Sequence, residues 1–194
     1  MFTLEDGVIT EEYDKFIKIN EPLPPKITQI TSITDDMLNN EGVSEDIIAQ
    51  DLKERLTKGT LMIAHNTHFD LSFIYYLLKR HFPDEADEIV SNLNWLDTVT
   101  VFKDRKCYPH KLIDAVHHYG IKEVNFHRAI DDTKALYEVT KALKNERDDL
   151  SEYINIFGYN PKYGVNGMRF SFIEYKAQYY SNYLRPSDEI LPRK

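Results

Sequence analysis

Two short clusters of histidine, asparagine and aspartate are the parts of this chain best suited to chemistry. The first comprises His65, Asn66, Phe69 and Asp70, and it lies where an apolar segment, Leu61–Ala64, gives way to a helical pattern. Ligands of α/β folds bind beside the carboxyl ends of strands, so this cluster is a candidate binding site. The alternative is that Asn66 and Asp70 only cap the helix that follows.

The second cluster runs from His127 to Asp132, at the start of a long helical pattern. His127 and Asp132 are five residues apart, so on an ideal helix their side chains point about 140° away from each other. This constraint relaxes if His127 precedes the helix. The carboxylate could then hold a divalent cation while the imidazole takes a proton from water. The alternative is an acidic helix start in which Asp131 and Asp132 only offset the helix dipole.

The patterns around these clusters predict a mixed α/β domain with a largely enclosed sheet. An Asp-Gly pair at 6–7 predicts an opening hairpin whose second strand continues, by its alternation, to about Asn20. Leu61–Ala64 predicts a buried strand, and 92–96 predicts another. The apolar spacing predicts longer helices over about 45–58, 66–78, 98–103, 110–119 and 128–144, with short helical turns near 27–30 and 34–39.

Composition limits the class of protein. The 194 residues are 42% hydrophobic and 29% charged, which fits one globular domain with a short appendage. A single cysteine, Cys107, excludes an intramolecular disulfide and a cysteine-rich zinc site. We expect a cytoplasmic protein with no membrane partner, because no apolar run could span a bilayer and the first residues lack a signal-peptide pattern. The net charge of -8 argues against bulk electrostatic binding of nucleic acid, but not against an enzyme whose carboxylates bind metal.

Together the two clusters resemble a known family. Segments 24–38, 64–70, 96–98 and 127–132 are similar, in this order, to motifs of DEDDh-type 3′–5′ exonucleases. Within that superfamily the chain looks most like the epsilon subunit of bacterial DNA polymerase III and the exonuclease domain of PolC-type polymerases. The resemblance covers about residues 1–145, and it implies a ribonuclease H-like fold, a mixed sheet flanked by helices.

The resemblance also implies a site. In that family four carboxylates bind two Mg²⁺ or Mn²⁺ ions, which activate a water and stabilise the leaving oxygen, and a histidine is the general base. Carried over by position, Asp70 and Asp132 are metal ligands and His127 is the base. Asp97, in a recurrent Asp-Thr, has a structural role. The residues of the substrate pocket are His65, Asn66 and Phe69, although Phe69 is better suited to the core.

One family motif has no match here. The first strand of the family carries an Asp-x-Glu that supplies two of the four carboxylates, and Met1 falls where the second strand should begin. The fold is therefore expected to lack its first strand. This favours a chain that starts at an internal methionine of a longer protein. The alternative is a chain that begins here and has lost catalysis, since Asp70 and Asp132 alone are expected to bind metal weakly.

Two functions from different classes follow. The first is a metal-dependent 3′–5′ exonuclease that removes nucleotides from single-stranded 3′ ends of DNA. It would act in proofreading or repair, beside a DNA polymerase subunit, and the missing motif would impair its activity in this chain. The second is a non-catalytic module of the same fold that binds nucleic acid or docks on a polymerase. RNA trimming by the same chemistry stays open, because the motifs contact phosphates and metals rather than base edges.

The end of the chain differs in composition from the rest. We predict an exonuclease domain over 1–148 and an aromatic-rich extension over 149–194. Residues 150–194 contain seven of the thirteen tyrosines, with 6 basic and 4 acidic residues against 18 and 28 in residues 1–149. These aromatic side chains could pack the extension onto the domain, hold a partner protein, or stack on single-stranded bases.

Overall fold

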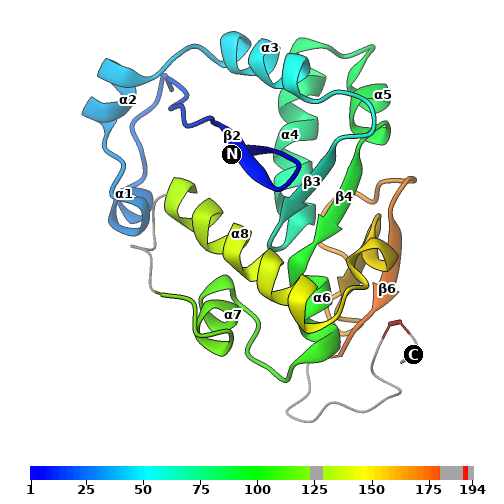
Figure 1. Ribbon diagram of the computed structural model, residues 1–194. Coiled ribbons are helices and arrows are strands. Elements are labelled where there is room, and N and C mark those ends of the chain that lie inside the picture. Colours follow the sequence, from blue (N-terminus) through cyan, green and yellow to red (C-terminus); the bar gives the residue numbers. More distant parts are fainter. Residues whose placement is uncertain (123–128, 180–189, 192–194) are drawn as a thin grey trace.

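The computed structural model describes residues 1–122, 129–179 and 190–191 as a mixed α/β protein (Figure 1). Within these ranges the strands form three pairs: β1 (Phe2–Glu5) with β2 (Val8–Glu12) antiparallel, β3 (Leu61–Ala64) with β4 (Asn94–Asp97) parallel, and β5 (Ile156–Tyr159) with β6 (Glu174–Ala177) parallel. The helices are α1 (Pro25–Thr31), α2 (Asp35–Glu41), α3 (Glu45–Arg55), α4 (Thr67–His81), α5 (Ala86–Ser91), α6 (Thr98–Arg105), α7 (Leu112–His118), α8 (Ala129–Glu146) and the 3-10 turn η1 (Leu150–Tyr153).

The opening hairpin is confirmed, and its turn explains why. Asp6 and Gly7 have φ values of 50° and 78°, the left-handed pair that a tight two-residue hairpin turn requires. The second strand is shorter than predicted, because β2 ends at Glu12 and the segment after it makes only one bridge, between Ile17 and Val43. Tyr13 still exchanges backbone hydrogen bonds with Met1, at 2.8 and 2.9 Å, and its hydroxyl donates to the Asp51 carboxylate of α3 at 2.9 Å.

Strand β4 lies between two hydrophobic clusters. Trp95 is 1% exposed and packs with α4 and α5, while the next residue, Leu96, is 2% exposed and packs with α6, α7 and α8. This alternation is what a strand covered on both faces requires. Figure 1 shows α8 crossing in front of the strands, beside α6. Trp95 therefore lies in the core of the domain.

Strand β3 is less buried than predicted. Leu61 is 41% exposed, and the other three residues of the strand are only partly buried. In the described residues β3 pairs with β4 on one edge and with no strand on the other. A strand with one free edge keeps more of its surface in water than a strand with neighbours on both sides, which accounts for the difference.

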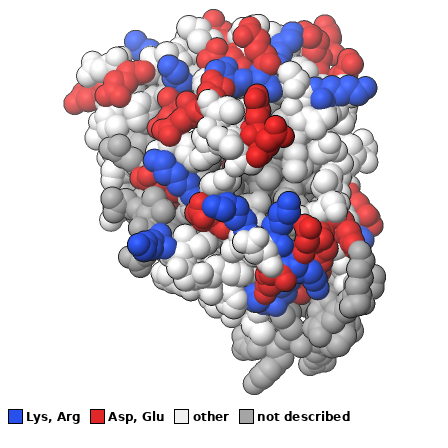
Figure 2. All heavy atoms as spheres, in the orientation of Figure 1, with Lys and Arg blue, Asp and Glu red and all other residues white. Residues whose placement is uncertain are grey.

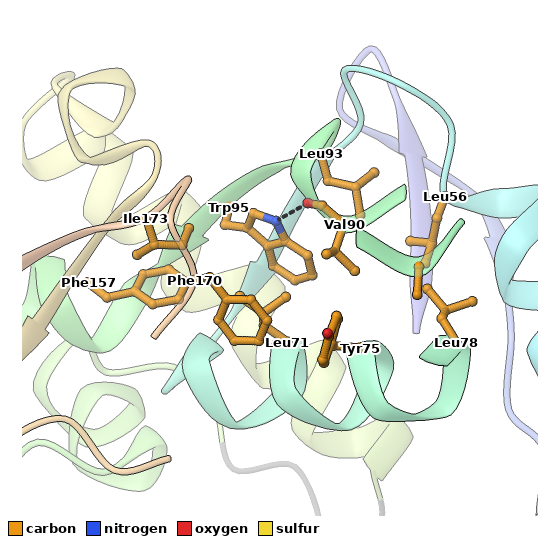
Figure 3. Packing of buried hydrophobic residues seen from close by; sticks show 11 residues of the cluster. Leu56, Leu71, Tyr75, Leu78, Val90, Leu93, Trp95, Phe157, Phe170 and Ile173 are labelled. Carbon is orange, nitrogen blue, oxygen red and sulfur yellow. Dashed lines mark hydrogen bonds between the residues drawn. The ribbon is translucent and has the colours of Figure 1, made fainter. Parts of the chain in front are cut away.

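The C-terminal segment packs into the domain. The backbone of Asn155 donates to Trp95 O at 2.7 Å and accepts from Glu174 N at 2.8 Å, so it links β4 to the β5–β6 pair. Figure 3 shows Phe157, Phe170 and Ile173 against Trp95 and the inner face of α4. Packing, the first of the three roles considered for this segment, is therefore confirmed for its described part. The strands β5 and β6 themselves were not predicted.

Acidic side chains dominate one part of the surface. Figure 2 shows Asp and Glu gathered over α2 and α3 on the face drawn there, and the first turns of these helices contribute Asp35, Asp36, Glu45 and Asp46. Acidic residues in a first turn offset the positive end of the helix dipole. None of the helices in the described ranges has the length and apolar character needed to cross a membrane.

Candidate active site

The first cluster forms the junction between β3 and α4. Asn66 occupies the N-cap position of α4 with φ 75° and ψ 51°, a left-handed conformation that asparagine tolerates better than most residues. Its side chain makes no capping hydrogen bond. The expectation that Asn66 caps α4 is therefore right about its position and wrong about its side chain.

Asp97, at the end of β4, supplies the missing cap. The side chain is 3% exposed, and its Oδ1 accepts from the backbone N–H of Asn66 at 2.9 Å and of Thr67 at 3.1 Å. The same carboxylate accepts from Val99 N at 3.3 Å and from the Thr100 hydroxyl at 2.6 Å. Asp97 thus fixes the first turns of α4 and α6 together, and its predicted structural role is confirmed.

A signal for this role is present in the sequence. An aspartate that ends one parallel strand lies beside the carboxyl end of the neighbouring strand, because parallel strands end at the same edge. In the register here, Asp97 is opposite Ala64. The Asp97 side chain can therefore reach the turn that begins at His65.

His65 is held by the protein through both ring nitrogens. Its Nε2–H donates to His110 O at 2.9 Å, and its Nδ1 lies 3.0 Å from the Thr98 hydroxyl, which itself donates to Ala64 O at 3.0 Å. Burial lowers the pKa of His65 below its usual value, and it does the same for His110. The ring of His65 therefore ties β3 to the segments that contain Thr98 and His110, and contact with a substrate would require one of these bonds to break.

This pair of histidines predicts an acid-sensitive fold. Because burial lowers the folded-state pKa, the unfolded chain binds protons more readily, so the stabilisation is complete above about pH 6.5 and is lost as the pH falls below that value. We expect the melting temperature of the protein to drop between pH 7 and pH 5, and His65→Gln to reduce that drop. His117→Gln, at an exposed position, is the control. An unchanged pH dependence in His65→Gln would contradict the assignment.

Asp70 lies in the first turn of α4. The residue is exposed as a whole, yet protein atoms around the carboxyl exclude enough water to raise the pKa of Asp70 to about 6, and the charge of Asp97 adds to this. No hydrogen bond or ion pair joins its side chain to another described side chain. A carboxylate that is desolvated and unpaired is well suited to meet a cation.

Phe69 is 58% exposed, and its ring centroid lies 4.7 Å from that of Phe73, which is 64% exposed. The expectation that Phe69 belongs to the core is wrong. The apolar side of α4 is formed instead by Leu71, Tyr75 and Leu78, which face Trp95 and its neighbours. Phe69 lies about 160° from Leu71 around an ideal helix, so it points away from that core.

The second cluster is described only in part. Asp132 is half-buried in the first turn of α8, and Asp131 lies 3.7 Å from Lys134 in an ion pair. His127, the candidate general base, is outside the described residues. Nowhere in the described ranges do three or more histidine, cysteine, aspartate or glutamate side chains gather closely enough to hold a metal ion. Asp70 and Asp132 therefore stay predicted metal ligands, by their positions in the sequence motifs.

The carboxylate that this site offers in the described residues is a type of ligand that Mg²⁺ prefers. Mg²⁺ in phosphoryl-transfer sites is bound by one or two carboxylates, with water and substrate phosphates completing its shell. Asp70 offers an unpaired carboxylate at the carboxyl edge of β3 and β4, where the turn is fixed by Asp97. When bound, such an ion polarises the phosphoryl oxygen and lowers the pKa of its water.

Comparison with known proteins identifies the family of this chain. A family model described as exonuclease (RNase_T) matches residues 2–140. A PolC-type DNA polymerase III of Clostridium perfringens is 29% identical over 167 residues, which cover 84% of this chain and 11% of that protein. The 3′–5′ exonuclease DinG of Bacillus subtilis is 32% identical over 135 residues, covering 68% of this chain and 14% of the relative. The chain thus spans about a tenth of the length of these curated relatives.

Two solved structures agree with this fold. Exonuclease X in complex with 5′ overhanging duplex DNA superposes with a TM-score of 0.55 at 16% identity, covering 78% of this chain and 84% of that one. Escherichia coli exonuclease I in complex with a dA16 oligonucleotide superposes with a TM-score of 0.64 at 20% identity, covering 76% of this chain and 36% of that one. At these identities the likeness concerns the fold, whereas the family model spans most of the sequence. From this match we conclude that the chain belongs to the RNase_T family, the 3′–5′ exonucleases of the DEDDh type.

Proposed function

We propose that this chain is a metal-dependent exonuclease unit that removes nucleotides from single-stranded 3′ ends of DNA. It acts in proofreading or repair, either as part of a longer polymerase-associated protein or beside a polymerase subunit. The observation that carries the proposal is the match of the exonuclease family over residues 2–140, which includes both histidine-aspartate clusters. Relatives named as PolC-type DNA polymerase III and as a 3′–5′ exonuclease support DNA as the substrate.

In this proposal Asp70 and Asp132 hold Mg²⁺ or Mn²⁺, and His127 accepts the proton of the attacking water. Asp97 and Thr67 keep the first turn of α4 in place, so that Asp70 meets the ion without a change of backbone conformation. Asn66 and Phe69 lie on the exposed side of that turn, where a terminal nucleotide would contact them. His65 supports the turn from within.

The same proposal includes reduced activity of this 194-residue chain. The sequence contains no Asp-x-Glu, so two of the four carboxylates of the family are absent from it. With two ligands the ions would be bound weakly and positioned loosely, and positioning accounts for much of the rate of phosphoryl transfer. We expect hydrolysis to be slow and to need millimolar metal.

A nuclease assay tests the proposal. Single-stranded DNA labelled at its 5′ end should be shortened from its 3′ end in Mn²⁺ or Mg²⁺, one nucleotide at a time, and EDTA should stop the reaction. DNA blocked by a 3′-phosphorothioate linkage is the control for direction. A matched RNA oligonucleotide decides whether the substrate is DNA or RNA.

The rival function is a binding module of the same fold without catalysis. What favours it is the missing Asp-x-Glu. It predicts that single-stranded DNA binds equally well with and without EDTA, and that no product forms even at high enzyme concentration. Metal-independent binding together with intact DNA would replace the exonuclease proposal by this one.

A further inference from the structure

The loop between β5 and β6 presents positive charge and tyrosine rings beside α4. Residues 156–177 contain three basic residues and one acidic residue, in a chain with a net charge of -8. Lys162 and Arg169 are exposed, and no carboxylate in the described part of the chain lies within ion-pair distance of either. Lys176, by contrast, is 3.5 Å from Glu174. Two exposed cations are thus left without acidic partners there.

The aromatic rings lie next to these two cations. The Arg169 guanidinium is 5.5 Å from the ring centroid of Tyr159 and 5.3 Å from that of Tyr175. The Lys162 ammonium is 5.2 Å from the ring centroid of Tyr163, and that residue is 71% exposed. Tyr163 is exposed, whereas Tyr159 and Tyr175 are half-buried. An exposed aromatic ring beside basic side chains is the combination by which proteins hold single strands, with bases on the ring and phosphates on the cations.

The loop has a fixed shape. The Asn160 carbonyl accepts from Tyr163 N at 3.0 Å and from Gly164 N at 2.9 Å, while its side-chain oxygen accepts from Lys162 N at 2.9 Å. Gly164 has a φ of 71°, which closes this turn. Lys162 and Tyr163 are therefore held by backbone hydrogen bonds, and binding would not have to order them first.

The loop is also attached to the helix that carries Asp70. His68 Nε2–H donates to Met168 O at 2.8 Å, and the His68 ring meets the edges of Phe157, Phe170 and Tyr175 at centroid distances of about 6 Å. His68 and Asp70 point about 160° apart on an ideal helix. The loop therefore lies across the first turn of α4 from the candidate metal ligand, close to the site but not in it.

We infer that Lys162, Tyr163 and Arg169 form a binding surface for single-stranded DNA, which contacts nucleotides upstream of the 3′-terminal one. This inference rests on the proposed function, since it places the strand relative to Asp70. Two of the three roles considered for the C-terminal segment are combined: its inner side chains pack against Trp95, and its outer ones hold the strand. A terminal nucleotide at Asp70 would lie on the other side of the first turn of α4 from the loop.

The position of the loop predicts a dependence on oligonucleotide length. With binding measured by fluorescence anisotropy in Ca²⁺, the double variant Lys162→Ala/Arg169→Ala should bind 5′-labelled dT15 at least tenfold more weakly than the native chain. Binding of dT3 should be unchanged. The slope of log affinity against log salt for dT15 should fall by about 0.7 for each lost phosphate contact, about 1.4 in all. Tyr163→Ala should weaken dT15 binding about tenfold and leave the slope unchanged.

The matched control is Lys18→Ala/Lys58→Ala, which removes two exposed lysines from other parts of the surface. Equal affinity of this control and of Lys162→Ala/Arg169→Ala for dT15, with an equal salt slope, would overturn the inference while leaving the exonuclease proposal intact. If the native chain bound neither oligonucleotide and cleaved no DNA, the proposed function and the inference would both fail. Preferential loss of RNA binding in the double variant would also overturn the inference.

Discussion

Asp70→Asn and Asp132→Asn should each lower Mn²⁺- or Mg²⁺-dependent hydrolysis of a 3′ end by about a hundredfold to a thousandfold. An amide is a neutral and weaker ligand, and electrostatic stabilisation of charge at the reacting phosphate is usually the largest part of such a rate. For Asp70 the loss should not come from unfolding, because its side chain makes no bond to another described side chain. The measurement is the initial rate of single-nucleotide release at saturating metal.

Asp131→Asn is the matched control for this experiment. Asp131 precedes Asp132 on α8 and faces Lys134 at 3.7 Å, so its replacement removes the same charge from the same helix turn. Its rate should stay within a factor of two or three of the native rate. Since activity of this chain is expected to be low, Mn²⁺ affinity gives a second measurement, and it should fall in Asp70→Asn and Asp132→Asn only. Native metal affinity in both variants would refute the assignment of these ligands.

Asp97→Ala should lower the free energy of unfolding by about 3 kcal/mol or more. The carboxylate accepts from three buried donors, Thr67 N, Val99 N and the Thr100 hydroxyl. Each buried donor left without a partner costs about 1–3 kcal/mol. Urea unfolding followed by circular dichroism measures the change.

Asp97→Asn separates the hydrogen bonds from the charge. Its side-chain oxygen can still accept from the backbone N–H groups of Asn66 and Thr67, but its amide cannot accept from Thr100. We therefore expect a smaller loss than in Asp97→Ala. Asp36→Ala, at an exposed position in α2, should change the stability by less than about 0.5 kcal/mol. An Asp97→Ala protein as stable as the native one would show that other groups hold the start of α4.

The sequence by itself determined the features that depend on neighbours along the chain. The Asp-Gly pair predicted the hairpin because both residues can take positive φ. The spacing of apolar residues predicted α8, which extends from Ala129 to Glu146 in the described residues. The spacing of histidine and aspartate in two motifs predicted the family, and the matching family model covers both motifs. Local conformation and residue type are enough for each of these inferences.

Only the tertiary structure decided how these pieces face one another. Asn66 has the residue type of a helix cap, but the cap of α4 comes from Asp97, 31 positions away in sequence. Phe69 has the residue type of the core, but it is exposed because Leu71, Tyr75 and Leu78 face Trp95. The strands β5 and β6 lie beside β4 because Asn155 bonds to Trp95. Each of these outcomes depends on contacts between segments that are distant in sequence. The free energies of such contacts are set by packing and burial, so the local pattern of residues does not predict them.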